Sequence, residues 1–101
     1  MKKHIIISGK VQGVGFRYWL RNEANQKNVY GWVKNKVSGE VEALFVGDDA
    51  KISDLIKLCK KGPPSSKVTK ISVQNYQGEY LNKSFEIING QYVCGNTCIV
   101  C

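Results

Sequence analysis

The residues with the clearest chemical potential form a short, glycine-punctuated loop that ends in an arginine. The segment Gly9–Arg17 reads GKVQGVGFR. A helix is predicted to begin at Phe16, so the backbone N–H groups of the loop would gather at the positive end of the helix dipole. Arg17 would add a fixed charge and a two-pronged hydrogen-bond donor at the same place. This combination predicts an anion site, with phosphate as its natural ligand.

Familiar phosphate motifs do not match this loop. A Walker loop needs Gly-Lys-Ser/Thr, whereas this one ends in Gly15-Phe16-Arg17. The dinucleotide fingerprint needs a small residue where Tyr18 stands, and a cysteine phosphatase needs its nucleophile where Val11 stands. The alternative is that the glycines only permit a sharp turn and that Arg17 is solvated.

The loop and a second stretch together resemble the acylphosphatase family. The segment 9–17 is similar to the family's first motif, and Gly31–Val41, GWVKNKVSGEV, is similar to its second. Further similarity lies at Gly62-Pro63, Val68 and Phe85–Ile87. The resemblance covers roughly residues 3–88. It implies a ferredoxin-like fold and the hydrolysis of carboxyl-phosphate anhydrides to carboxylate and inorganic phosphate.

The resemblance also implies roles for individual residues. It assigns substrate binding to Arg17 and the positioning of the attacking water to Asn35. The phosphate-binding loop that it implies comprises Gln12, Gly13, Val14, Gly15, Phe16 and Arg17. Arginine stays protonated and so can bind phosphate but cannot act as a general base. The Asn35 side chain can accept and donate hydrogen bonds without titrating.

The two motifs indicate direct attack by water. They hold no cysteine or histidine, and their carboxylate, Glu40, lies beyond a predicted hairpin turn. We therefore expect no covalent enzyme intermediate, and we expect an oxygen of the substrate's own phosphate to receive the water proton. This mechanism requires no cofactor and no metal. Lys10, Lys34 and Lys36 are expected either to raise the local positive potential or to belong to a solvated sheet edge.

The elements that would position these residues follow from apolar spacing. Residues 4–11 predict a buried strand ending near Lys10, and residues 16–27 an amphipathic helix. Two further strands, a second helix and two more strands are predicted over residues 30–36, 40–47, 48–61, 68–73 and 85–88. The order predicts an α+β, ferredoxin-like β-α-β-β-α-β sandwich with an antiparallel sheet, two helices on one face and a short extra C-terminal strand.

Length and charge limit the classes of protein that remain. The chain has 101 residues and a formal net charge of +7 at pH 7. This length fits one domain and excludes a two-domain enzyme or an eightfold βα barrel. We divide it into a domain over residues 1–90 and a tail over 91–101. The apolar run after Met1 ends at Ser8, too short for a secretory signal, and no run could span a bilayer. We expect a cytoplasmic monomer that binds no membrane.

The tail carries three of the four cysteines, in the spacing C-x3-C-x2-C. The three are Cys94, Cys98 and Cys101. The spacing resembles the cluster-binding segment of radical S-adenosylmethionine enzymes, and Cys98–Cys101 is also a zinc half-site without a paired one. The favoured alternative is a flexible extension whose thiols bind no metal. Cys59 falls on the apolar face of the second helix and is expected to be buried.

Two other functions remain as alternatives to a small-molecule hydrolase acting on an acyl phosphate. The first is a non-catalytic, phosphate-binding accessory domain of a larger maturation or carbamoyl-transfer system, similar to the amino-terminal domain of hydrogenase maturation carbamoyltransferases. The second is an RNA-binding module, because the RNA-recognition motif shares the predicted element order. The stretch Glu40–Val46 contains two acidic residues and one aromatic, which disfavours base stacking. We therefore expect no nucleic-acid partner.

Overall fold

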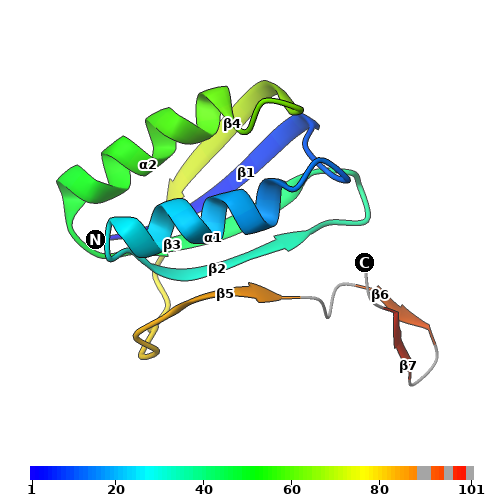
Figure 1. Cartoon of the computed structure of the whole chain (residues 1–101). Coiled ribbons are helices and arrows are strands. Elements are labelled where there is room, and N and C mark those ends of the chain that lie inside the picture. The colour runs from blue at the N-terminus through cyan, green and yellow to red at the C-terminus, as the bar shows by residue number, and fades with distance from the viewer. Residues whose placement is uncertain (89–91, 95–96, 100–101) are drawn as a thin grey trace.

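The computed structural model describes residues 1–88, 92–94 and 97–99. A five-stranded sheet carries two helices on one of its faces (Figure 1). The elements that form this body are β1 (Lys2–Lys10), α1 (Phe16–Gln26), β2 (Tyr30–Asn35), β3 (Val41–Val46), α2 (Asp49–Lys61), β4 (Lys67–Asn75) and β5 (Phe85–Ile88). Every element expected within residues 1–88 is present, and the ferredoxin-like α+β class is confirmed.

The four strands β1 to β4 form the expected antiparallel sheet, and the extra C-terminal strand β5 makes the sheet mixed. Its strand order is β4-β1-β3-β2-β5. The first four strands pair antiparallel, but β5 pairs parallel to β2, with Phe85 opposite Gly31. The reason is the path of the chain between β4 and β5. It crosses from the β4 edge to the β2 edge and reverses direction, and β2 also runs opposite to β4.

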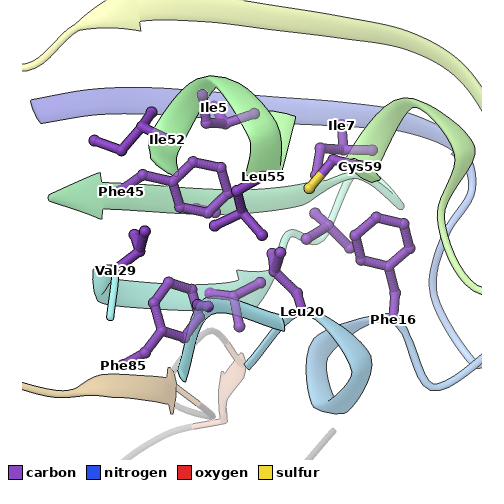
Figure 2. Packing of buried hydrophobic residues seen from close by; sticks show 14 of the residues in the cluster. Ile5, Ile7, Phe16, Leu20, Val29, Phe45, Ile52, Leu55, Cys59 and Phe85 are labelled. Atoms are coloured by element: carbon purple, nitrogen blue, oxygen red, sulfur yellow. The ribbon is translucent and has the colours of Figure 1, made fainter. Parts of the chain in front are cut away.

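The core lies between the helices and the sheet, as Figure 2 shows. The buried positions of α1 are Phe16, Leu20 and Ala24, and those of α2 are Ile52, Leu55 and Cys59. Both sets match the spacing expected for amphipathic helices. The rings of Phe45 and Phe85 lie 6.1 Å apart and extend the core beneath α1 toward β5. Burial raises the pKa of the Cys59 thiol to about 12, so this residue packs as a small apolar side chain.

Local signals set the ends of the helices. Asn28 follows α1 with a φ of 55°, a left-handed conformation that asparagine tolerates better than most residues. Asp48 caps α2, because its Oδ2 accepts hydrogen bonds from the N–H groups of Ala50 and Lys51 at 3.1 and 3.3 Å. An aspartate at this position is a favoured N-cap, so the start of α2 is stabilised by its own chain.

The C-terminal stretch contains a short ribbon. The backbone of β6 (Tyr92–Cys94) pairs antiparallel with that of β7 (Thr97–Ile99). Cys101 lies outside the described residues, and so does any expectation about metal or disulfide bonding by the tail thiols. In the part of the chain that the structure describes, no helix is long and apolar enough to cross a membrane. The same part brings together no three His, Cys, Asp or Glu side chains that could hold a metal ion.

Candidate active site

Three apolar side chains hold the loop between β1 and α1 against the core. Val11 and Phe16 are buried, and Val14 packs against the same cluster. Phe16 also meets Trp19 edge to face, with ring centroids 5.3 Å apart. The end of α2 packs on this ring, because a Cβ built on Gly62 would lie 3.0 Å from it. The core thus holds the loop through Val11, Val14 and Phe16, and the glycines between these residues are exposed to solvent.

The two glycines between these anchors adopt left-handed backbone conformations. The φ angle is 73° at Gly13 and 77° at Gly15, and both residues are exposed. A Cβ added to either would meet nothing within 4 Å. Glycine is favoured here by its conformation rather than by lack of room. Among the described residues, the space beside these two Cα atoms is unfilled.

The first turn of α1 is not capped by a side chain. Gly15 is the N-cap residue and has no side chain that could cap the turn, and the turn contains no acidic residue. The helical ladder starts where the Trp19 N–H donates to the Gly15 carbonyl at 3.0 Å. The earlier N–H groups have no acceptor within the helix and lie at the positive end of its dipole. This end of the helix suits a phosphate.

Arg17 stands in this first turn, where the sequence predicted it. The preceding residue, Phe16, is buried, whereas Arg17 is half-buried. Successive residues of an α-helix are rotated by about 100°. The Arg17 side chain is therefore directed away from the core that holds Phe16. Its guanidinium adds charge and paired N–H donors to the uncapped turn.

The side chain of Gln12 ties the loop to the β2–β3 hairpin. Its Nε2 donates to the backbone carbonyl oxygens of Lys36, at 2.7 Å, and Glu40, at 2.9 Å. The Lys36 N–H in turn donates to the Glu40 carbonyl at 2.8 Å. Figure 1 shows the loop and the hairpin turn beside each other at the same end of the sheet. The Gln12 side chain therefore holds the loop in place against the hairpin.

Asn35 is the last residue of β2 and lies on the helix-covered face of the sheet. It pairs with Val41, which pairs with Ile7, and all three side chains are buried. Within β2, burial alternates, so Asn35 shares this face with Gly31 and Val33. The row of core side chains thus ends in an amide, next to the hairpin residues that Gln12 contacts.

The Asn35 side chain carries an unsatisfied buried acceptor. The residue is only 6 % exposed, and its Oδ1 has no hydrogen-bond partner among the described residues. Such an atom costs about 1–3 kcal/mol of folding stability. A water molecule can satisfy it by donating an O–H. The arrangement therefore offers donors for an anion at the loop and α1, and an acceptor for a water at the end of β2.

The carboxylate of Glu40 is held within the hairpin. It accepts hydrogen bonds from the hydroxyls of Ser38, at 2.9 Å, and Ser8, at 3.0 Å. These bonds, together with the nearby charges of Lys36 and Lys70, lower the pKa of Glu40 from its ordinary value of 4.5. The carboxylate is ionised and engaged at neutral pH, which does not suit it to accept a proton in catalysis.

Lys34 corrects the expectation that three lysines enrich the site. It alternates with Asn35 and therefore points to the opposite, uncovered face of the sheet. There its Nζ lies 3.6 Å from a carboxylate oxygen of Glu42 and 5.3 Å from the centroid of the Trp32 ring. Lys36 pairs with Glu40 at 3.9 Å, and Lys10 is exposed at the end of β1. The charge of Lys34 therefore lies on the face of the sheet that carries no helices and does not contribute to the candidate site.

The structure shows two features of the site that the sequence reasoning missed. The first is the bridging role of the Gln12 side chain, which depends on a contact between residues far apart in the chain. The second is the burial of Asn35 without a hydrogen-bond partner for its oxygen. The alternation of polar and apolar residues along Tyr30–Asn35 was a usable signal for the second, because it places Asn35 on the side of Val33.

Comparisons with known proteins identify the family of this chain and agree with its fold. The acylphosphatase family model matches residues 3–87. An acylphosphatase of Acidiphilium cryptum is 46% identical over 69 residues, which are 68% of this chain and 76% of that protein. The crystal structure of acylphosphatase from Bacillus subtilis has a TM-score of 0.82 and 40% identity, covering 86% of this chain and 97% of that one.

A larger protein contains a similar domain. The crystal structure of full-length HypF in its phosphate- and nucleotide-bound form matches with a TM-score of 0.78 and 35% identity. The match covers 86% of this chain but only 11% of HypF. The stand-alone acylphosphatases match over most of their own length, which favours them over the accessory-domain alternative. On its sequence and its fold, this chain belongs to the acylphosphatase family.

Proposed function

We propose that this enzyme hydrolyses acyl phosphates by direct attack of water on a phosphoryl group held at the start of α1. The phosphate oxygens accept hydrogen bonds from the loop backbone over residues 12–17 and from the Arg17 guanidinium. The side chains of Val14 and Phe16 face the core and anchor this backbone. Binding to fixed donors at an uncapped helix end stabilises the charge that develops on the phosphoryl oxygens.

The attacking water is oriented by Asn35. One O–H of the water donates to the buried Oδ1, which directs the water oxygen toward phosphorus. The new O–P bond forms as the bond between phosphorus and the bridging oxygen breaks, and its electron pair leaves with the carboxylate. The water proton passes to a phosphoryl oxygen. Because a carboxylate is a good leaving group, the reaction needs no protein acid or base.

The observation that carries this proposal is the buried, unpartnered Oδ1 of Asn35 at the end of the hairpin that Gln12 joins to the loop. A protein core disfavours such an atom, so its retention is explained by a ligand. An anion cradle alone would bind phosphate without needing an acceptor beside it. The acceptor is what converts a binding site into a hydrolytic one.

Phosphate release from benzoyl phosphate in excess EDTA tests the proposal. The full chain should turn over rapidly, and Arg17→Ala should lose activity by about 10³-fold while remaining folded. A chain ending at Ile88 should keep the wild-type rate, because we propose residues 1–90 as the catalytic domain and 91–101 as an appended tail. Absence of turnover by the folded full chain would refute the function and favour the accessory domain.

We further propose that the enzyme works in the cytoplasm as a monomer on small acyl phosphates and not on nucleic acid. The loop, Arg17 and Asn35 all come from one chain. The uncovered face of the sheet carries Glu42 at its centre, bonded to His4 and beside Lys34, and a carboxylate there opposes a nucleic-acid backbone. Gel filtration and an RNA-binding assay at low salt test both statements.

A further inference from the structure

A second guanidinium lies beside the proposed phosphate site. Arg21 follows Arg17 by four residues in α1 and so shares its side of the helix. Side chains of an α-helix lean toward its N-terminus. Arg21 does so, since its Cζ lies 5.3 Å from the centroid of the Tyr18 ring. The charged end of Arg21 thus reaches back to the first turn of α1, over the ring of Tyr18.

Tyr18 supports this placement without neutralising the charge. The ring is 55% exposed and offers its face to the guanidinium. A cation–π contact occupies the face of the guanidinium and leaves the N–H donors at its edge available to an anion. Within the described residues, the carboxylate of this helix, Glu23, pairs with Lys27 at 3.9 Å rather than with Arg21.

The surroundings of the site give little scope for selection by shape. The described residues enclose no pocket, and positions next to Gly13 and Gly15 are open. An acyl group attached to a bound phosphate would lie on the surface of the first turn. Selection among acyl groups there depends on charge, because an open surface cannot exclude a ligand by size.

We propose that Arg21 is a specificity determinant that binds a second anionic group on the acyl portion of the substrate. The preferred substrates would then be acyl phosphates that carry a carboxylate or another phosphate a short distance from the anhydride. The proposal rests on the proposed function, because it takes the phosphoryl group to be held by Arg17 and the loop. Arg21 contributes to affinity and leaves the chemical step unchanged.

A matched pair of substrates tests the role of Arg21. Benzoyl phosphate and 3-carboxybenzoyl phosphate differ by one carboxylate, and the ratio of their kcat/KM values reports recognition of that group. We expect Arg21→Gln to lower kcat/KM for the carboxylated substrate by about fivefold at low salt, through KM. Turnover of benzoyl phosphate should stay within about twofold of wild type.

Three further variants separate recognition from general charge and from structure. Tyr18→Leu removes the ring that seats Arg21 and should reduce the preference, whereas Tyr18→Phe keeps the ring face and should preserve it. Lys51→Gln removes one positive charge from the first turn of α2 and should leave the ratio unchanged. An Arg21→Gln variant with the wild-type ratio, or an equal loss with Lys51→Gln, would overturn the proposal.

Binding of non-hydrolysable analogues keeps this test separate from catalysis. Benzoylphosphonate and 3-carboxybenzoylphosphonate have no anhydride to cleave, so their Kd values report recognition whether or not the protein turns over. The expected result is the same fivefold preference, lost in Arg21→Gln. Equal Kd values for the two analogues in the wild-type protein would refute the role of Arg21 and leave the proposed hydrolysis intact.

Discussion

The two helices of this protein begin in opposite ways. α2 starts at Asp48, whose carboxylate accepts hydrogen bonds from two N–H groups of the first turn, and Asp49 adds a second negative charge. α1 starts at Gly15 in a left-handed conformation, with no side-chain cap and no acidic residue in its first turn. Both helices pack on the same face of one sheet and bury similar apolar faces.

This difference separates stability from function. The first turn of α2 is satisfied by its own chain, which favours folding. In our proposal, the first turn of α1 donates to a bound anion, and it carries a cation, Arg17, where a stabilising carboxylate would otherwise stand. The unsatisfied oxygen of Asn35 belongs to the same end of the molecule. The proposed active site therefore combines an uncapped helix end and an unsatisfied buried oxygen, and both of these features lower the stability of the fold.

Asn35→Leu is the strongest test of this separation. The substitution replaces an unsatisfied buried amide by an apolar side chain of similar size. We expect turnover of benzoyl phosphate to fall by about 10²–10³-fold, with no loss of stability in urea. Val33→Ala, two residues earlier on the same face, should instead cost about 2 kcal/mol of unfolding free energy. A marked loss of stability in Asn35→Leu would show that the amide serves folding.

A carboxylate introduced at the start of α1 would make this helix end resemble that of α2 and tests whether phosphate binds there. Gly15→Asp places a negative charge at the uncapped turn, where it competes with phosphate. We expect kcat/KM to fall by about tenfold relative to Gly15→Asn, which has the same backbone conformation and size without the charge. Equal kinetics for the two variants would mean that phosphate does not bind at this helix end.

Removing the cap of α2 should have the reverse consequence. Asp48→Ala leaves the N–H groups of Ala50 and Lys51 without their acceptor and should lower the unfolding free energy by about 1 kcal/mol. Turnover should not change, because this turn lies at the opposite end of the molecule from the loop (Figure 1). Asp54→Ala, on the exposed side of α2, is the matched control and should leave both quantities unchanged.

The smallest expected effect concerns pH. The pKa of Glu40 is lowered by its hydrogen bonds to Ser38 and Ser8. Its contribution to stability is therefore present above the unfolded-state pKa and is lost as the pH falls through the lower, folded-state value. Wild type should exceed Glu40→Gln in thermal stability at pH 7, and the difference should vanish under acid conditions. A difference that persists unchanged in acid would contradict this assignment.

The helices were predictable because their determinants are local. The spacing of Phe16, Leu20 and Ala24 marks one helix, and the carboxylate of Asp48 before an apolar repeat marks the start of the other. The glycine loop and Arg17 were also local signals. Each of these features depends only on residues that lie within a few positions of it in the sequence.

Features that depend on distant partners were not predictable in the same way. The parallel pairing of β5 with β2 follows from the path of residues 76–84, which carries no periodic pattern. The sequence predicts Gln12 as part of the phosphate-binding loop but does not reveal the partners of its side chain, which are carbonyls 24 and 28 residues away. Lys34 was placed at the site from its nearness in sequence, although a strand sends alternate residues to opposite faces.

The tether made by Gln12 links ligand binding to the local opening of the hairpin. Because the cradle is held in place by carbonyls of Lys36 and Glu40, a fluctuation that detaches the β2–β3 turn also releases the loop. A bound anion that requires the intact loop must then favour the closed hairpin. Phosphate should therefore slow hydrogen exchange at the amides of residues 36–40, which belong to the hairpin rather than to the proposed phosphate-binding loop.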